Sequence, residues 1–204
     1  MIPEIYFRVL RVFTEEELEI FQRFVYSKYC FRDGYLKPED YPEGRAVDEF
    51  DQHSAHFLLY PPNSENLAGS FRIVRHTKKH GLPIQKAFEL PNIYLDNFCE
   101  LTRVISQKYN NSLGNDSGIG KSVLFEAVRH AIVFCKQHDL NGWIGMADLL
   151  AFLKINKICK NTFMPVSPPI FYQGGWTMPA VLEIEKLFQV LRKDDPKLLR
   201  CFEG

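Results

Sequence analysis

Charged residues occupy segments of this chain that have the composition of β-strands and strand edges. Asp48 and Asp51 precede one predicted strand, and Arg72 lies within the next. Glu100 and Arg103 lie on a later strand. A half-buried strand normally turns apolar side chains inward, and a charge near a core persists only when it is paired and hydrogen-bonded. We therefore expect these five residues to meet as one ionic network inside a cleft, which makes them candidates for a functional site.

The composition limits the classes of protein that the chain can belong to. With 204 residues, 46% of them hydrophobic and 14% aromatic, it is long enough for one well-filled core, so a single domain over residues 1–204 is expected. The 25 basic and 25 acidic residues give a formal net charge of zero, which removes the broad positive field of most nucleic-acid-binding proteins. A DNA or RNA partner is not expected.

The cysteines and the amino-terminal sequence predict where in the cell the protein is found. An odd number of cysteines, at positions 30, 99, 135, 159 and 201, and the lack of a Cys-x-x-Cys pair argue against a disulfide framework. The first five residues lack a basic segment followed by an apolar one, and no apolar run approaches the roughly 18 residues of a spanning helix. We expect a soluble cytoplasmic protein. The six histidines show no metal-ligand spacing, so no metal site is predicted.

Apolar periodicity predicts interleaved strands and helices. Thr14 begins a capping box in which Glu17 follows three residues later, so a helix should start there. Residues 55–60 and 68–74 resemble a hairpin joined by a Pro-Pro-Asn-Ser turn. The other expected elements are strands over 4–13 and 98–106 and near 143 and 171, and helices over about 123–135, about 147–153 and about 179–191. This order indicates an α/β or α+β sheet domain.

The charged block also resembles a known family. Residues 40–51, Asp-Tyr-Pro-Glu-Gly-Arg-Ala-Val-Asp-Glu-Phe-Asp, and residues 53–59, His-Ser-Ala-His-Phe-Leu-Leu, are similar to the GNAT-fold autoinducer-synthase-like acyltransferases. These include acyl-homoserine lactone synthases, N-acyl amino acid synthases and exosortase-associated acyltransferases. Their pattern of Asp-x-x-Asp, an Arg on the following strand and a later Glu-x-x-Arg is matched by the five charged residues. Residues 167–174 resemble a Tyr-His-Gly segment near the family's last strands.

Three positions depart from the family pattern. Val25 stands in place of an arginine of an early helix, for which Arg23 could substitute from a shifted register as a substrate-binding residue. Arg32 stands where an acid usually follows, and Gly175 replaces part of a late Gly-x-Arg segment. These departures leave room for a divergent specificity or a weakened enzyme.

The resemblance implies a GNAT-like fold, with a central mixed sheet flanked by helices, and transfer of a fatty acyl group from a thioester to an amine. Glu100 is then the candidate general base, with an ion pair to an arginine as the structural alternative. Arg72 and Arg103 could bind an amino-acid carboxylate bidentately, or could be structural. Asp48 and Asp51 would hold the arginines and the amino-terminal segment.

The resemblance also assigns the donor side of the site. A backbone N–H near Val104, Ile105 and Ser106 would stabilise the oxyanion, and the acyl donor would be acyl carrier protein, through its phosphopantetheine, or coenzyme A. Asn115-x-x-Gly118-x-Gly120, followed by Lys121, has the spacing of the GNAT pyrophosphate loop. A flexible helix entry is the alternative, and the spacing does not fit a Walker A motif. No permanently bound cofactor is expected.

Several functions remain open from the sequence. The favoured one is synthesis of an N-acyl amino acid, with a small-molecule amine as acceptor. The alternatives are acyl-homoserine lactone synthesis from S-adenosylmethionine, and a non-catalytic acyl-thioester or lipid-binding regulatory protein. The basic run at residues 75–80 could dock acyl carrier protein or could be a solvated turn.

Overall fold

The computed structural model describes residues 7–90, 93, 95–107 and 117–203, with the backbone alone for residues 117–121. The strands are β1 (Arg8–Arg11), β2 (Ser54–Tyr60), β3 (Gly69–Arg75), β4 (Phe98–Ser106), β5 (Gly142–Asp148), β6 (Phe163–Pro165), β7 (Ile170–Tyr172) and β8 (Gly175–Glu183). The α-helices are α1 (Glu15–Phe31), α2 (Ser117–Gln137), α3 (Leu149–Ile158), α4 (Ile184–Asp194) and α5 (Pro196–Glu203). Short 3₁₀ helices lie at Pro38–Asp40, Asp51–His53, Pro83–Lys86 and Leu95–Asn97.

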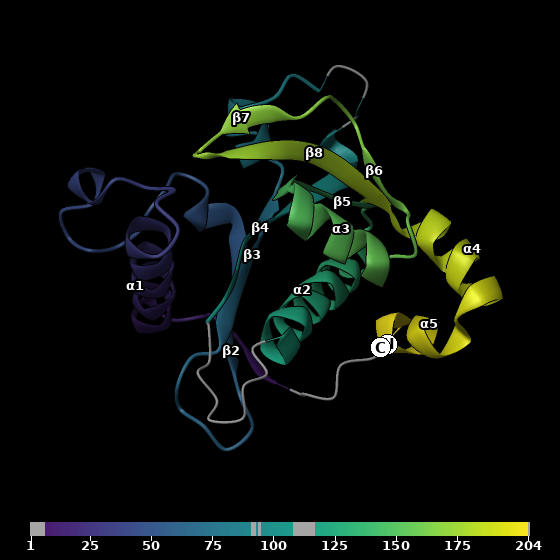
Figure 1. The fold of residues 1–204 in the computed structure, drawn as a ribbon, viewed down its shortest axis with the longest axis horizontal. Helices are drawn as coiled ribbons and strands as arrows, with labels where there is room; N and C mark the ends of the chain where they lie inside the picture. Colours follow the sequence, from purple (N-terminus) through teal and green to yellow (C-terminus); the bar gives the residue numbers. More distant parts are fainter. Residues whose placement is uncertain (1–6, 91–92, 94, 108–116, 204) are drawn as a thin grey trace.

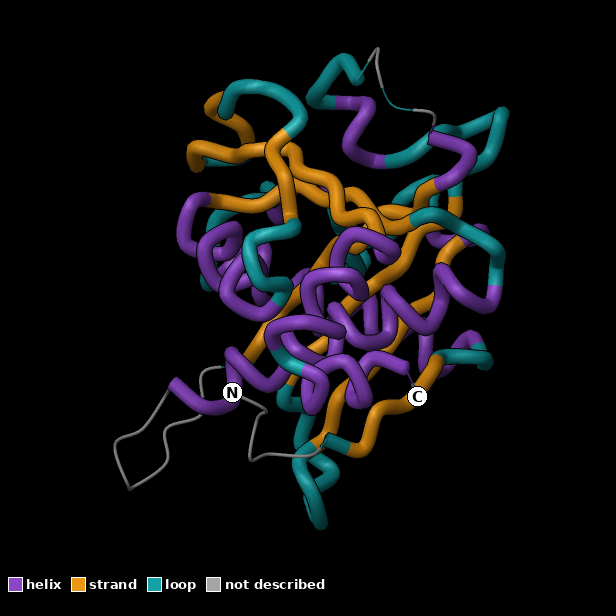
Figure 2. Tube along the Cα trace, turned by 90° about the vertical axis from the view of Figure 1, so that its right-hand side faces the viewer, coloured by secondary structure: helices purple, strands orange, loops and turns teal. Residues whose placement is uncertain are grey.

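The strands form one mixed sheet in the order β1-β2-β3-β4-β5-β8-β6, with β7 added against β8. Every neighbouring pair is antiparallel except β4 and β5, which run parallel. Helix α1 lies on one side of this sheet and α2 on the other (Figure 1). The view turned by 90° shows the strands passing behind the helices and curving over the top of the molecule (Figure 2). The predicted mixed sheet flanked by helices is confirmed.

Alternation along β2 divides the interior into two cores. Phe57 and Leu59 belong to the larger core, which α2 covers. Leu58 and Tyr60 point to the opposite face and pack with Phe21 of α1. The side-chain period of two in a strand therefore separates an α2 face of the sheet from an α1 face.

Helix α1 begins where the sequence predicts it. Thr14 Oγ1 accepts a hydrogen bond from the Glu17 N–H at 3.2 Å, and the Glu17 carboxylate accepts one from the Thr14 N–H at 3.2 Å. These reciprocal bonds satisfy two backbone donors that a helix start would leave without partners. The predicted hairpin and the strand over 98–106 are also present, as β2–β3 and β4.

Two helix boundaries in the last third differ from the prediction. Residues 179–183 continue β8, where Ala180 and Leu182 point into the large core and residues 177–183 pair with β5, so α4 begins only at Ile184. Residues 147 and 148 likewise end β5, and the Asp148 carboxylate caps α3 by accepting from the Ala151 N–H at 2.8 Å. In both cases pairing with a neighbouring strand outweighs local helix propensity.

Within the described residues, no helix combines the length and the apolar character needed to cross a membrane. All five cysteines are free, and the buried Sγ atoms of Cys99 and Cys135 lie 3.4 Å apart.

Candidate active site

Four of the five predicted charged residues form one ionic network on the α1 face. Arg72 Nη1 of β3 lies 2.7 Å from Asp48 Oδ1 and 2.7 Å from Asp51 Oδ1. Arg103 Nη2 of β4 lies 2.8 Å from Asp48 Oδ2, and its Nη1 donates to the Ala46 carbonyl oxygen at 2.8 Å. Because both guanidinium groups are engaged by the same two carboxylates, the network fastens the segment around residues 46–53 onto two strands of the sheet.

Polar side chains of α1, β2 and β4 complete the network. Gln22 Nε2 of α1 donates to Asp51 Oδ2 at 2.9 Å, and Arg72 Nε donates to Thr102 Oγ1 at 3.1 Å. His56 Nε2 of β2 lies 3.1 Å from Asp51 Oδ1. These bonds satisfy buried polar atoms that would otherwise be costly, so the network holds α1, β2, β3 and β4 together as well as the loop.

The pKa values of the network follow from its geometry. Burial alone would raise the pKa of Asp51, but the hydrogen bond from His56 and the charges of Arg103 and Arg72 hold it well below its ordinary value. Burial lowers the pKa of His56, so a neutral imidazole donates its Nε2 hydrogen to Asp51. Asp51 is therefore a permanent anion that offsets the arginines.

A β-bulge brings Arg103 to this face. Ser70 of β3 pairs with Ile105, but Arg72 pairs with Thr102, so β4 carries one extra residue between these pairs. Arg103 has a φ of 51°, a left-handed conformation that is uncommon for a residue other than glycine. Strained backbone of this kind costs about 1–3 kcal/mol and is found most often at functional sites.

The bulge changes which side chains of β4 point to each face of the sheet. Leu101 packs in the core on the α2 face, whereas Ile105, four residues later, packs in the core on the α1 face. In a regular strand these two residues would share a face, and Glu100 and Arg103 would lie on opposite faces. The extra residue is what allows Arg103 to reach Asp48.

Glu100 does not join the ion pairs. It is completely buried, its Oε2 accepts a hydrogen bond from the Ile84 N–H at 2.8 Å, and its Oε1 has no hydrogen-bond partner among the described residues. Burial raises the pKa of Glu100 to about 8, against the smaller lowering effects of the Ile84 N–H and of Arg72. The predicted alternative, an ion pair between Glu100 and an arginine, is not present in the described part of the chain.

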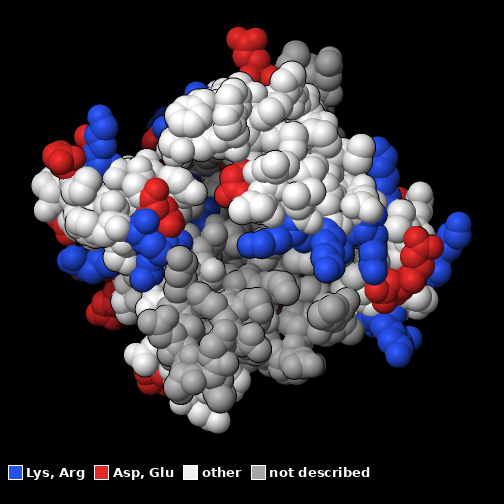
Figure 3. Space-filling view, viewed as in Figure 1, with Lys and Arg blue, Asp and Glu red and all other residues white. Residues whose placement is uncertain are grey.

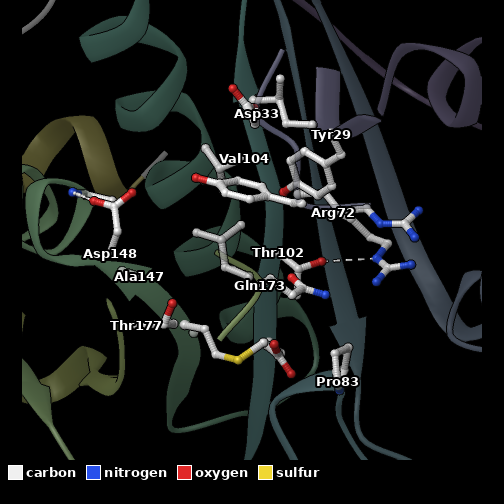
Figure 4. Close-up of a pocket in the computed structure, with 18 of the residues that line it drawn as sticks. Tyr29, Asp33, Arg72, Pro83, Thr102, Val104, Ala147, Asp148, Gln173 and Thr177 are labelled. Atoms are coloured by element: carbon white, nitrogen blue, oxygen red, sulfur yellow. Dashed lines mark hydrogen bonds between the residues drawn. The ribbon is translucent and has the colours of Figure 1, made fainter. Parts of the chain in front are cut away.

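The central strands diverge beside Glu100. The parallel pairing of β4 and β5 ends at Glu100 and Ile144, although β4 continues to Ser106 and β5 to Asp148. The backbone edges beyond that point border a cavity of about 750 Å³. Figure 4 shows Tyr29 and Arg72 on one side of this cavity, with Ala147, Asp148 and Thr177 across from them. The cavity therefore lies between the two diverging strands.

Both polar and apolar groups line the cavity. Its apolar wall includes Leu124, Trp143, Met146, Ile155 and Phe163. The polar groups include Glu100, Thr102 and Tyr29, and burial raises the pKa of the Tyr29 phenol to about 12, so it stays protonated at neutral pH. The cavity can therefore hold an apolar chain beside a carboxyl group and a phenol.

Some of the other predicted site residues line the cavity and some do not. Val104, Ile105 and Ser106 line the cavity, and their role on the donor side stays a prediction. Arg23 does not line it. That side chain is 54% exposed and pairs with Glu19 at 2.7 Å, so it does not replace the arginine absent at position 25.

Only part of the predicted phosphate loop lies within the described residues. Gly118, Gly120 and Lys121 lie in the first turns of α2, and Asn115 lies outside the described residues. The phosphate-binding role of this segment therefore stays a prediction.

The three departures from the family pattern lie at informative places. Val25 of α1 is fully buried in the core on the α1 face of the sheet. Arg32 lines the cavity, pairs with Asp33 at 2.6 Å and donates to the Ser106 carbonyl oxygen, and Gly175 also lines the cavity. Position 32 thus carries a cation that is neutralised by the next residue.

Several residues that the structure places in the site are not predicted from the sequence. Gln22 and Tyr29 fall on one side of α1 at helical spacing, and Thr102 follows Glu100 by two residues on the same strand face. The period of each element could have pointed to them. Among the described residues, no cluster of three or more His, Cys, Asp or Glu side chains is arranged to hold a metal ion.

Comparisons with known proteins agree with this architecture. Residues 25–116 match a family described as an acetyltransferase (GNAT) domain. BjaI, a CoA-dependent acyl-homoserine lactone synthase solved with SAM and isopentyl-CoA, has a TM-score of 0.67 at 16% identity, over 92% of this chain and 88% of its own. The chain therefore has the GNAT fold. No curated protein matches it in sequence.

Two further solved structures share this fold. LasI, an AHL synthase, gives a TM-score of 0.62 at 14% identity, over 89% of this chain and 91% of its own. FeeM, an N-acyl amino acid synthase from uncultured soil microbes, gives 0.59 at 14% identity, over 91% and 94%. The predicted resemblance is confirmed at the level of the fold.

Proposed function

We propose that this chain transfers a fatty acyl group from an acyl thioester to the amine of an amino acid. The observation that carries the proposal is the position of Glu100. A fully buried carboxyl group with one oxygen lacking a partner among the described residues lines a cavity that opens where β4 and β5 separate. An unsatisfied buried polar atom is costly, so it marks a place where a ligand group completes the bonding.

The reaction needs few protein groups. The acceptor nitrogen attacks the thioester carbonyl carbon, the C–S bond breaks, and an amide and a thiol are formed. The ionised form of Glu100 takes the proton that the amine nitrogen loses, directly or through a water, and a proton returns to the leaving thiolate. With a pKa of about 8, this carboxylate is basic enough to accept a proton from an amine.

The donor would enter between the diverging strands. Their backbone edges, which no longer pair with each other, face the cavity at Val104–Ser106 and could donate to the oxyanion as it forms. Apolar side chains on the α2 side, among them Trp143 and Phe163, would hold the acyl chain. Coenzyme A is the favoured donor because BjaI is a CoA-dependent enzyme, with acyl carrier protein as the alternative.

The arginines take a positioning role in this proposal. Arg72 and Arg103 are already bonded to Asp48 and Asp51, so a bound carboxylate would have to displace one of those acids. Their contribution is to hold β3, β4 and the segment around residues 46–53 in the geometry that shapes the cavity. Another group must therefore recognise the carboxylate of an amino-acid acceptor.

A second candidate acceptor is S-adenosylmethionine, which would give an acyl-homoserine lactone. The similarity to BjaI and LasI, both acyl-homoserine lactone synthases, favours this acceptor, and the similarity to FeeM favours an amino acid. The three structures share the fold with this chain at similar identity, so the comparison does not separate the two acceptors. The amino-acid acceptor remains our proposal because the stretch from Tyr35 to Asp51 resembles the amino-acid-acylating relatives more closely.

The experiment compares lipid extracts of cells that express the wild type, Glu100→Gln or Glu126→Gln. Glu126 is a matched control, because it is also buried but pairs with Arg129 of its own helix at 2.8 Å and does not line the cavity. Mass spectrometry should find a new N-acyl amino acid with the wild type and the control, and its loss with Glu100→Gln. A new acyl-homoserine lactone would establish the second acceptor instead.

The purified chain supplies the negative result. If the folded wild type binds acyl-CoA tightly but forms no product with any amino acid or with S-adenosylmethionine, the proposal is wrong and the chain is an acyl-thioester-binding protein.

A further inference from the structure

One face of the molecule exposes a cluster of large apolar side chains. Its members are Leu149, Leu150 and Leu153 of α3, Phe171 of β7 and Trp176 of β8, each more than half exposed. We call these five side chains the apolar face.

The elements that carry the apolar face are neighbours. Strand β7 pairs with β8, and α3 packs against β8. The rings of Phe171 and Trp176 meet edge to face across the β7–β8 hairpin, with centroids 6.1 Å apart. Figure 3 shows a mostly white surface over this part of the molecule, interrupted by an acidic side chain, with a row of basic side chains along its lower edge.

Charge is segregated around the apolar face. Residues 149–182 contain three lysines and neither Asp nor Glu, and the exposed Asp148 that precedes them caps α3 by accepting from the Ala151 N–H. Lys160 pairs with Asp195 of another segment at 2.8 Å, whereas Lys154 and Lys157 are exposed on α3 beside the leucines. The apolar face is therefore bordered by positive charge.

Apolar side chains bordered by lysines are typical of a surface that rests on a membrane. Leu, Phe and Trp enter the boundary between headgroups and acyl chains, and lysines at the same level meet anionic headgroups. Exposed apolar clusters of this size mark interaction sites. An acidic protein partner could pair with the lysines, but it would also need an exposed apolar surface of matching shape. An anionic bilayer supplies both negative headgroups and apolar acyl chains. We propose that the apolar face docks on an anionic lipid bilayer.

Docking would place the cavity opening against the lipid. Leu150 and Lys154 of α3 line the cavity, and so do Gln173 and Gly175 at the tip of the β7–β8 hairpin. An acyl chain could then pass between the bilayer and the cavity without entering water. This consequence rests on the proposed function, whereas the docking itself does not.

Intrinsic fluorescence can report the docking directly. The chain has two tryptophans, of which Trp143 is 1% exposed and Trp176 is 64% exposed, so a change on binding reports Trp176. Vesicles of phosphatidylcholine with phosphatidylglycerol should shift the emission to the blue and carry the protein into the pellet on sedimentation. Vesicles of phosphatidylcholine alone should bind more weakly, and added salt should weaken binding to the anionic vesicles.

Two double variants test the two parts of the surface. Lys154→Gln with Lys157→Gln should weaken binding by about fivefold for each lysine. Leu149→Ser with Leu153→Ser should abolish the sedimentation. The matched controls are Lys78→Gln with Lys79→Gln, on an exposed turn, and Phe13→Ser, which is 78% exposed before α1. Both controls should bind as the wild type does.

Three results would overturn the proposal. They are a folded wild type that binds no anionic vesicles, an equal loss of binding in the control variants, and binding to acyl carrier protein through the apolar face with none to vesicles. Circular dichroism of every variant establishes that it is folded. A failure of vesicle binding leaves the acyl-transfer assay unaffected, so the two proposals fail separately.

Discussion

Replacement of Glu100 by Gln should make this protein more stable at neutral and alkaline pH, although it removes the proposed base. The Glu100 side chain is completely buried, and only one of its oxygens has a hydrogen-bond partner among the described residues. A glutamine has nearly the same shape, can still accept from the Ile84 N–H, and never has to carry a charge in this site. The cost of burying a carboxylate therefore disappears.

The magnitude follows from the pKa of Glu100. In the folded chain it is about 8 rather than the ordinary 4.5, so between these values the native state holds a proton that the unfolded state has lost. The unfolding free energy of the wild type must then fall as the pH rises through this window. Below pH 4.5 Glu100 is protonated in both states, so it does not change the unfolding free energy there. At about 1.4 kcal/mol for each pKa unit, the loss is about 3 kcal/mol at pH 7 and about 4 kcal/mol at pH 8, and it approaches its limit of about 5 kcal/mol above pH 8.

Urea unfolding followed by circular dichroism at several pH values measures this effect. The difference in unfolding free energy between Glu100→Gln and the wild type should be small near pH 5 and should grow in favour of the variant up to about pH 8. Groups shared by both proteins cancel in the difference.

Glu65→Gln is the control, because the Glu65 side chain is 91% exposed and should change stability little at any of these pH values. A difference between Glu100→Gln and the wild type that stays constant from pH 5 to pH 8 would refute the argument from burial.

Three further changes test the network and the sheet by urea unfolding. Asp51→Asn should cost about 3 kcal/mol at pH 7, and this cost should shrink below about pH 4, because the low pKa of Asp51 makes its ionised form stabilising and that contribution is lost as the pH falls; a pH-independent cost would argue against the charge pairing. Thr102→Val should cost about 1–3 kcal/mol, since it leaves the buried Nε of Arg72 without its acceptor; a neutral substitution would mean that water satisfies this atom. Gly142→Ala should prevent normal folding because the new Cβ would overlap a backbone carbonyl of β8, whereas Gly174→Ala, in open space at a φ of 82°, should cost only about 1 kcal/mol; equal effects would mean that β5 and β8 can move apart.

The ionic network could be anticipated because charge on a buried strand needs a partner. Asp48, Asp51, Arg72 and Arg103 are expected to pair on that ground alone, and all four meet. The expectation that Glu100 joins them is wrong, since its partner is a backbone N–H of the 3₁₀ helix Pro83–Lys86, and a backbone group leaves no signature in the sequence.

The bulge in β4 was beyond sequence reasoning for a related reason. A spacing of three between Glu100 and Arg103 places the two on opposite faces of a regular strand, and only the left-handed backbone at Arg103 brings it to the α1 face. The late helix was misplaced because residues 179–183 are held in β8 by pairing with β5, a contact between segments far apart in the chain. Long-range pairing of this kind is not encoded in local propensity.

The most direct test of the central claim is the pH dependence of thiol release from acyl-CoA in the presence of the acceptor amine. If the buried Glu100 takes the proton of the acceptor, kcat/KM of the wild type should rise with pH and level off near pH 8, where this carboxyl ionises. Glu100→Gln should be slower by about 100-fold or more and should lack that inflection. Equal rates and the same pH profile in the two proteins would contradict the account.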